Sequence, residues 1–286
     1  MDRITVRIKD RKRRKGMKRF MGVVFTVVLF LGIVTIAEAD EGAFIIDNVP
    51  TIAGIIVGAA PEYVGSEDYT AMAAPIVRYT FEKQYRYIQL MATTLSFNVL
   101  NHPNFTLGPA LNYRPGRKDV ENDRVDDMED IDATAEAGIF AGYTWRDTAD
   151  PRYRFITSVE LLSDIGNEYD GWIASLSARF WFPVSKPLDL QVGVGTTYGN
   201  SQYMDHYFGV DETDAADSGL DEYKADDDFR DVNGQIAGVY KLTKNWRLLG
   251  IVKYTYIVGE AADSPIVDDE GSESQLMAGF GAAYSW

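Results

Sequence analysis

Cysteine is absent from the 286 residues, which excludes disulfides, thiolate metal sites and cysteine nucleophiles. Histidine is almost as scarce, with His102 and His206 as its two representatives. Ser96 and Ser201 lie near these histidines in the sequence, but neither pair has a recognisable nucleophile motif. The composition is mildly polar overall, which excludes a bundle of membrane-spanning helices. We therefore predict no enzyme, no cofactor and no metal site.

The sequence has one long apolar run, and it lies near the N-terminus. This run, Phe20 to Ile36, follows a flank with ten Lys and Arg residues. Ala37 and Ala39 form a small-x-small cleavage pattern before Asp40. This order predicts a secretory signal peptide over residues 1–39, with residues 40–286 as the mature domain. An uncleaved anchor helix is the alternative. Met17 would begin a signal of ordinary length, so residues 1–16 are a candidate over-called start.

Basic residues are few in the mature chain. Removing ten basic and three acidic residues with the signal leaves 18 basic and 40 acidic residues, a net charge of −22. Such a surface repels nucleic acid, so we predict no nucleic-acid partner.

The mature chain alternates apolar with polar or glycine residues. Leu188 to Gly199 places leucine, valine, threonine and tyrosine on one face and Asp189, Gln191 and glycines on the other. Leu276 to Trp286 alternates in the same way and ends on an aromatic residue. A period of two indicates strands, in a soluble sandwich or a membrane barrel.

Three features favour an antiparallel up-and-down transmembrane β-barrel. Many segments have 10–14 residues, enough to cross a bilayer at a tilt. Aromatic residues gather at segment ends, as in interfacial girdles. Charged residues occur within the polar faces, which a wet lumen tolerates and a dry core does not. The predicted lumen charges are Arg78, Glu136, Arg154, Glu160, Arg179 and Arg247. They would line a narrow pore or pair across it, and we expect a narrow or loop-occluded lumen.

Eleven segments are recognisable, whereas a single-chain bacterial barrel has an even number of strands. The early segments are predicted near 52–60, 72–82, 85–95 and 104–114. Either Ala43 to Val49 supplies a twelfth strand or one early segment is not a strand. We predict about twelve strands, with ten as the alternative. Short connections alternate with long acidic ones, which places the C-terminus in the periplasm and the long loops outside.

Several short sequence motifs occur in a characteristic order, at residues 60–69, 108–117, Tyr203, 207–210, 218–220 and 262–267. In that order and spacing the chain resembles the MltA-interacting protein MipA/OmpV family of outer-membrane proteins. The loop residues that carry the resemblance are Pro61, Tyr63, Gly65, Ser66, Tyr207, Phe208, Gly209, Ser218, Gly219, Asp263, Ser264 and Pro265. The motifs at Pro61 and Asp263 could form a surface for a partner, or each could supply a turn at a strand end. Departures from the family pattern are the basic extension before Met17, the acidic run from Asp211 to Asp231 and the final Trp286.

The resemblance implies a non-enzymatic barrel in the Gram-negative outer membrane, which scaffolds a lytic murein transglycosylase and a murein synthase in peptidoglycan metabolism. Expected partners also include outer-membrane lipid, lipopolysaccharide and the outer-membrane assembly machinery, which would read Tyr284 and Trp286 as a C-terminal signal. A surface adhesin or ligand-binding barrel and a narrow small-solute channel are the alternatives. The acidic clusters at 126–130 and 226–228 lack a calcium-loop pattern, so we read them as solvated loops.

Overall fold

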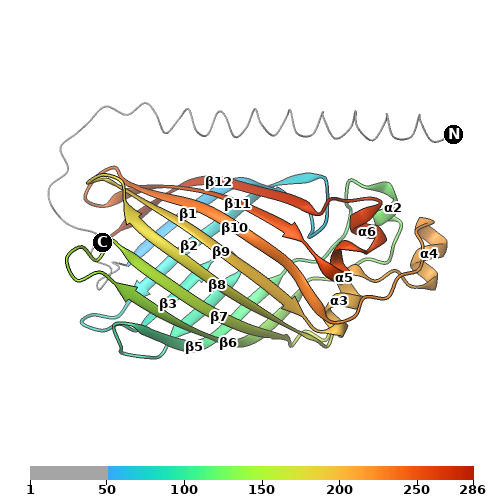
Figure 1. Ribbon diagram of the computed structural model, residues 1–286, viewed down its shortest axis with the longest axis horizontal. Coiled ribbons are helices and arrows are strands. Elements are labelled where there is room, and N and C mark those ends of the chain that lie inside the picture. Colours follow the sequence, from blue (N-terminus) through green and yellow to red (C-terminus); the bar gives the residue numbers. More distant parts are fainter. Residues whose placement is uncertain (1–50) are drawn as a thin grey trace. The chain divides into compact units, whose positions relative to one another are not determined.

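Residues 51–286 are described by a computed structural model, in which the strands close into an antiparallel barrel. The ring runs through neighbouring strands in chain order and closes where β1 pairs with β12 (Figure 1). Its twelve strands are β1 Ile52–Pro61, β2 Tyr69–Thr80, β3 Tyr87–Met91, β4 Thr94–Asn98, β5 Phe105–Arg114, β6 Thr134–Arg146, β7 Arg154–Asp164, β8 Trp172–Pro183, β9 Leu188–Gly199, β10 Asp228–Lys241, β11 Trp246–Ile257 and β12 Ser274–Ser285. No helix among the described residues has the length and apolar character needed to cross a membrane.

The twelve-strand prediction is confirmed, and the explanation that one early segment is not a strand is wrong. The segment predicted near 85–95 is two short strands, β3 and β4, joined at Ala92 and Thr93. Ala43 to Val49 lies outside the described residues, and the ring closes among residues 51–286 without it. The ten-strand alternative is also wrong.

A proline in the neighbouring strand explains where the β3–β4 hairpin turns back. The β2–β3 ladder ends after Ile76 pairs with Met91, and the Ala92 N–H then donates to the Pro75 carbonyl at 2.9 Å. Pro75 has no N–H to continue the ladder. Ala92 adopts a positive φ of 52° at the turn, a conformation for which glycine or asparagine is the usual sequence signal. The turn was missed because neither residue type is present.

Alternation divides the strands into a lipid-facing and a lumen-facing set. On β5, the outward residues Phe105, Leu111 and Tyr113 are each at least half exposed. Two rows of outward aromatic side chains lie near the strand ends, with contacts such as Phe105 with Tyr143 and Trp172 with Tyr198. Such girdles are typical of membrane barrels. Ile173 and Trp181, exceptions to the alternation of β8, lie on the inner face with the polar residues.

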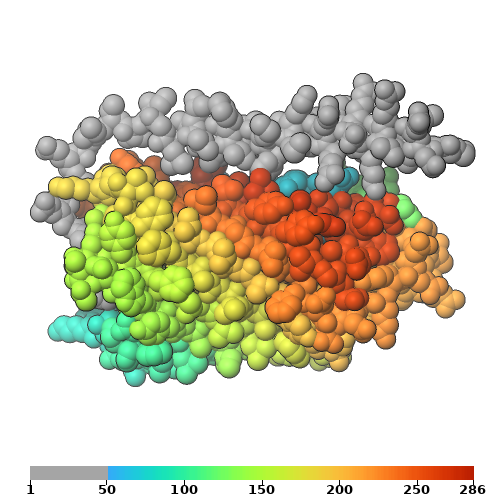
Figure 2. All heavy atoms as spheres, in the orientation of Figure 1, coloured from blue at the N-terminus to red at the C-terminus, as the bar shows by residue number. Residues whose placement is uncertain are grey.

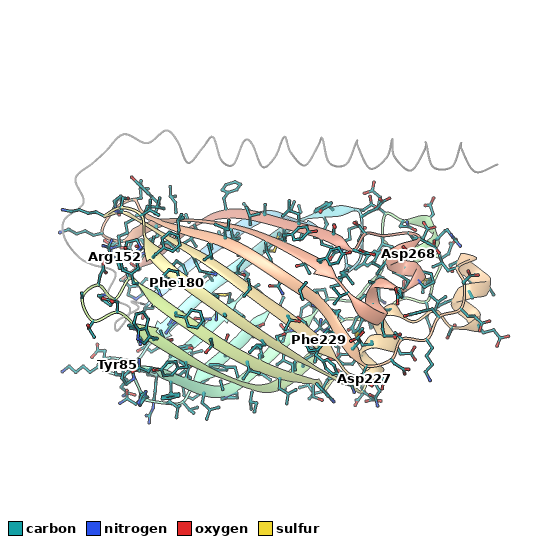
Figure 3. The ribbon with its side chains drawn as sticks, viewed as in Figure 1. Tyr85, Arg152, Phe180, Asp227, Phe229 and Asp268 are labelled. Carbon is teal, nitrogen blue, oxygen red and sulfur yellow. The ribbon has the colours of Figure 1, made fainter. Side chains whose placement is uncertain are left out.

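The two ends of the barrel differ in their connections, as Figure 1 shows. We define the turn end by residues 81–86, 99–104, 147–153, 184–187 and 242–245. The opposite, loop end carries segments 62–68, 115–133, 165–171, 200–227 and 258–273, three of which are longer than any turn, and we call these five segments the cap. The cap holds the helices α2 Asp123–Asp126, α3 Ser201–Phe208, α4 Glu212–Ser218, α5 Gly259–Ala262 and α6 Pro265–Asp268. In Figure 3, Tyr85 and Arg152 mark the turn end, and Asp227 and Asp268 mark the loop end.

Candidate functional site

The cap packs into the mouth of the barrel through an apolar core. Tyr203, Met204 and Phe208 of α3 are at most 1% exposed. They pack in one cluster with inward-facing barrel residues such as Ile173 and Ile257. In the view of Figure 2, residues from the last third of the chain cover the loop end. A second cluster joins Val125, Met128, Val210, Leu220 and Ile266. Loops that are far apart in the sequence therefore form one packed unit.

Ser264 connects two of the family motifs within the cap. Its hydroxyl donates to the carbonyl of Phe208 at 2.6 Å. The same side chain is the N-cap of α6, where Pro265 occupies the first turn. Pro at this position and a serine N-cap both favour the start of a helix. This motif thus both begins a helix and fixes it to the loop of residues 200–227.

Gly65 and Ser66 connect the first loop to the last. Gly65 has a φ of +108°, and a Cβ atom here would lie 2.7 Å from Val267 Cγ2. Its carbonyl accepts a hydrogen bond from the Ser272 N–H at 2.7 Å. Ser66 is 2% exposed and pairs with Gly271 in an isolated bridge. Glycine is needed here because the backbone conformation and the close approach both exclude a side chain.

Arginines join the remaining motifs. Arg124 Nε donates to the Ser218 carbonyl at 2.9 Å, and its guanidinium also contacts the Gly219 carbonyl. Gly219 ends α4 in the left-handed conformation with a φ of 68°. Arg117 Nη1 donates to the Tyr207 carbonyl at 3.3 Å, and the Arg117 guanidinium carbon lies 5.8 Å from the centre of the Tyr63 ring. The structure therefore gathers motif residues of four loops in the cap.

A pocket of about 330 Å³ lies beside α3 at the loop end. Its lining includes the cationic side chains Arg114, Arg117 and Lys253, one carboxylate, Glu62, and the aromatic residues Tyr63 and Tyr207. Burial raises the pKa of Tyr63 to about 12, against the opposing effect of Arg117, so this phenol stays neutral. Arg114 is paired with Glu136, so Arg117 and Lys253 against Glu62 give the pocket a small excess of positive charge, which favours a small anionic solute.

Glu136 is the centre of a polar network beneath the cap. It is fully buried and accepts from Arg114 Nε at 2.6 Å, Asn112 Nδ2 at 2.7 Å and the Tyr169 hydroxyl at 2.5 Å. Burial of a carboxylate is tolerated when it is paired and hydrogen-bonded. The sequence predicts Glu136 as a lumen charge but does not predict its partners Arg114 and Tyr169. Arg114 and Glu136 lie on adjacent strands, but their contact depends on a strand register that the sequence does not give.

The other predicted lumen charges also occupy inward positions. Arg78 lies on β2, Arg154 on β7 and Arg179 on β8. Glu160 of β7 lies opposite Ser175 of β8, and Arg247 of β11 is 6% exposed. Glu136 pairs with an arginine, but none of the described contacts joins Arg78, Arg154 or Arg179 to a carboxylate in an ion pair. The lumen thus combines a neutralised region near the cap with a cationic region near the turn end.

The two histidines have local structural contacts. His102 Nδ1 accepts from the Asn104 and Phe105 N–H groups, both at 3.1 Å, in a turn. His206 packs against Tyr169 and Tyr207, with Nε2 3.5 Å from Glu168 Oε1. Burial lowers the pKa of His206. No described hydrogen bond joins Ser96 or Ser201 to these histidines, so the structure does not assemble a Ser–His pair in residues 51–286.

Comparison with known proteins identifies the family. The family model described as MltA-interacting protein MipA matches residues 53–286. The chain belongs to this family. It is 25% identical over 219 residues to the putative outer membrane protein YiaT of Escherichia coli strain K12, covering 76% of this chain and 83% of that protein. It is 23% identical over 152 residues to the MltA-interacting protein of the same strain, covering 53% of this chain and 57% of that protein.

Among solved structures, the NanC porin aligns with a TM-score of 0.47 and 7% identity, over 81% of this chain and all of that one. With its closed barrel and its named relatives, this MipA-family chain is an outer-membrane protein. Its predicted assembly signal ends β12, where the outward Tyr284 stacks with Trp286 and the Trp286 N–H donates to the Thr51 carbonyl at 3.1 Å. The predicted cleavage residues Ala37, Ala39 and Asp40 lie outside the described residues.

The acidic clusters of this MipA-family chain make structural hydrogen bonds. Asp126 Oδ1 accepts from the Val120 N–H at 2.9 Å, and Asp228 Oδ2 accepts from the Glu260 N–H at 3.2 Å. Within residues 51–286, no three His, Asp or Glu side chains are grouped as a metal site would require. These carboxylates shape loops in the described part of the chain.

Proposed function

We propose that the chain is a non-enzymatic scaffold of the outer membrane that binds a lytic murein transglycosylase and a murein synthase at its turn end. Membership of the MipA family and the name of its MltA-interacting relative support this proposal. Bacterial barrels have short turns on the periplasmic side, where peptidoglycan lies, and longer loops outside. The turn end is therefore the end that meets murein enzymes.

A charge difference between the two ends carries the proposal. The five segments of the cap contain 28 acidic and 4 basic residues, whereas the five turns contain 3 acidic and 5 basic residues. The basic residues of the turns are Lys83, Arg86, Arg152, Lys186 and Lys244. A basic rim on a strongly acidic protein attracts and orients an acidic partner surface. The packed cap occupies the mouth of the lumen, which makes a wide solute channel a less suitable function for this barrel.

A pull-down with purified components tests the scaffold. The full chain in detergent should retain the soluble forms of an MltA-type transglycosylase and a murein synthase. The triple variant Lys83→Glu, Lys186→Glu and Lys244→Glu should lose at least about 10-fold in affinity, because it places like charges against an acidic surface. Neutralising Asp211, Asp214 and Asp217 to Asn at the loop end is the matched control. Absence of retention by the folded wild-type chain would reject the proposal.

Ligand binding at the loop end is a second candidate function, favoured by the cationic pocket beside α3. Removing one of its three positive charges with Arg117→Gln should then weaken binding of an external anionic ligand while enzyme retention at the turn end persists. The opposite pattern would favour the scaffold alone.

A further inference from the structure

Arginine side chains converge inside the barrel near the turn end. Arg78 of β2, Arg154 of β7 and Arg179 of β8 occupy lumen-facing positions. We call these three residues the arginine cluster. Arg154 lies within electrostatic reach of the other two, although β2 and β7 are far apart in the ring. The cluster therefore spans the lumen.

Tyr87 adds a neutral polar group to the same region. Its phenol on β3 lies within electrostatic reach of both Arg78 and Arg179. The Arg78 guanidinium carbon lies 3.7 Å from the centre of the Tyr87 ring. A tyrosine hydroxyl can donate a hydrogen bond to an anion held by neighbouring guanidinium groups.

Carboxylates do not balance this charge. Asp189 is the acidic residue in electrostatic reach of Arg154, but the two make no ion pair, and Asp189 Oδ1 lies 3.9 Å from Arg152 Nη1 at the rim. Arg78 Nη1 donates to Gln89 Oε1 at 3.3 Å, and Arg179 Nη2 donates to Ser158 Oγ at 3.1 Å. These contacts are with neutral side chains.

Several donors of the cluster also lack acceptors. Arg78 Nε, Arg154 Nη1 and Arg179 Nε are buried and make no hydrogen bond to the described residues. Arg154 is only 7% exposed and stacks on Trp181 with 4.3 Å between the guanidinium carbon and the ring centre. A guanidinium remains protonated at every physiological pH, so deprotonation cannot remove the repulsion between these charges. Carboxylate and phosphate oxygens match the geometry of such donors.

We propose that the arginine cluster is a binding site for a small polyvalent anion, carrying phosphate or carboxylate groups, that enters from the turn end. The packed cap obstructs approach from the loop end, whereas the turns at the other end are short. This site is distinct from the pocket beside α3, whose lining contains none of the three arginines. It requires no partner protein and is independent of the scaffold proposal.

Calorimetric titration of the full chain in a zwitterionic detergent tests the site, with inorganic pyrophosphate and citrate as probes. We expect saturable binding of about one anion per barrel. Arg154→Gln and Arg179→Gln should each weaken binding at least about 10-fold, since each removes charge-assisted hydrogen bonds. Tighter binding of pyrophosphate would assign a phosphate ligand, and tighter binding of citrate would assign a carboxylate ligand.

Lys83→Gln is the matched control, because it removes one positive charge from the rim at the same end and should leave the affinity unchanged. Each variant is first checked for the heat-dependent gel shift of a folded barrel, and two separate arginine variants protect the test against failure of one to fold. Absence of saturable binding by the folded wild-type chain would overturn the proposal. An equal loss of affinity in Lys83→Gln would also overturn it, by moving the anion to the rim.

Discussion

Contacts at the turn end lie within single turns or join neighbouring turns and strands, whereas contacts at the loop end join several distant loops into one packed cap. At the turn end, Asp147 Oδ1 accepts from the Ala149 N–H at 2.8 Å and Thr243 Oγ1 accepts from the Trp246 N–H at 3.0 Å. At the loop end, Ser264 bonds to Phe208, 56 positions away. This difference predicts that the cap opens as a unit while the strand ladders of the barrel persist.

Truncating a side chain at the centre of the cap core should have the largest effect on the stability of the loop end relative to the barrel. Phe208→Ala leaves a cavity at a side chain that is 1% exposed, which should cost about 3–5 kcal/mol. Because the barrel ladders do not include Phe208, the cap should open and the barrel persist. Trypsin should then cleave after Lys224 while the heat-dependent gel shift remains.

Phe180→Ala on the lipid face is the control for Phe208→Ala, since Phe180 is 37% exposed and lies outside the cap. It should leave the cap resistant to trypsin. Loss of the folded barrel together with the cap in Phe208→Ala would show that the two ends are not separable.

Gly65→Ala should have an intermediate effect confined to the loop end. The positive φ and the close approach of Val267 make the substitution strained, at a cost of roughly 1–3 kcal/mol. Hydrogen exchange measured by mass spectrometry should become faster in residues 62–68 and 258–273. In the control, Gly250→Ala, a Cβ meets no atom within 4 Å, so exchange should not change. Equal exchange in both variants would contradict the packing described for Gly65.

The smallest expected effect is a pH dependence restricted to the loop end. Burial lowers the pKa of His206, so the folded cap favours the neutral imidazole. Its contribution to cap stability is full above the ordinary histidine pKa of roughly 6.5 and is lost as the pH falls below that value toward the lowered pKa. Exchange in residues 200–227, corrected for intrinsic rates, should rise between about pH 7 and about pH 5.

His206→Gln should flatten that pH profile, and His102→Gln at the turn end should leave it intact. A profile that is unchanged in His206→Gln would assign the pH dependence to other groups of the acidic cap.

The barrel was predictable because each strand carries its own alternating pattern. Leu276 to Trp286 indicated an outward-facing final strand, and the structure pairs it with both β1 and β11. The β3–β4 hairpin was not predictable from its own residues, because Ala92 and Thr93 carry no turn signal and Pro75 lies in another strand. The loop motifs could be recognised in the sequence, but their packing into one cap could not be predicted from it.

The sequence by itself determined the membrane-barrel class, the family resemblance and which residues face the lumen, since a strand's alternation depends on adjacent residues alone. Tertiary structure decided which lumen charges meet. Arg114 joins Glu136 through the β5–β6 register, whereas Arg78 and Arg154 approach each other because ring closure brings distant strands around one lumen. Strand register and closure depend on contacts between segments far apart in the chain, and a single strand's pattern contains neither.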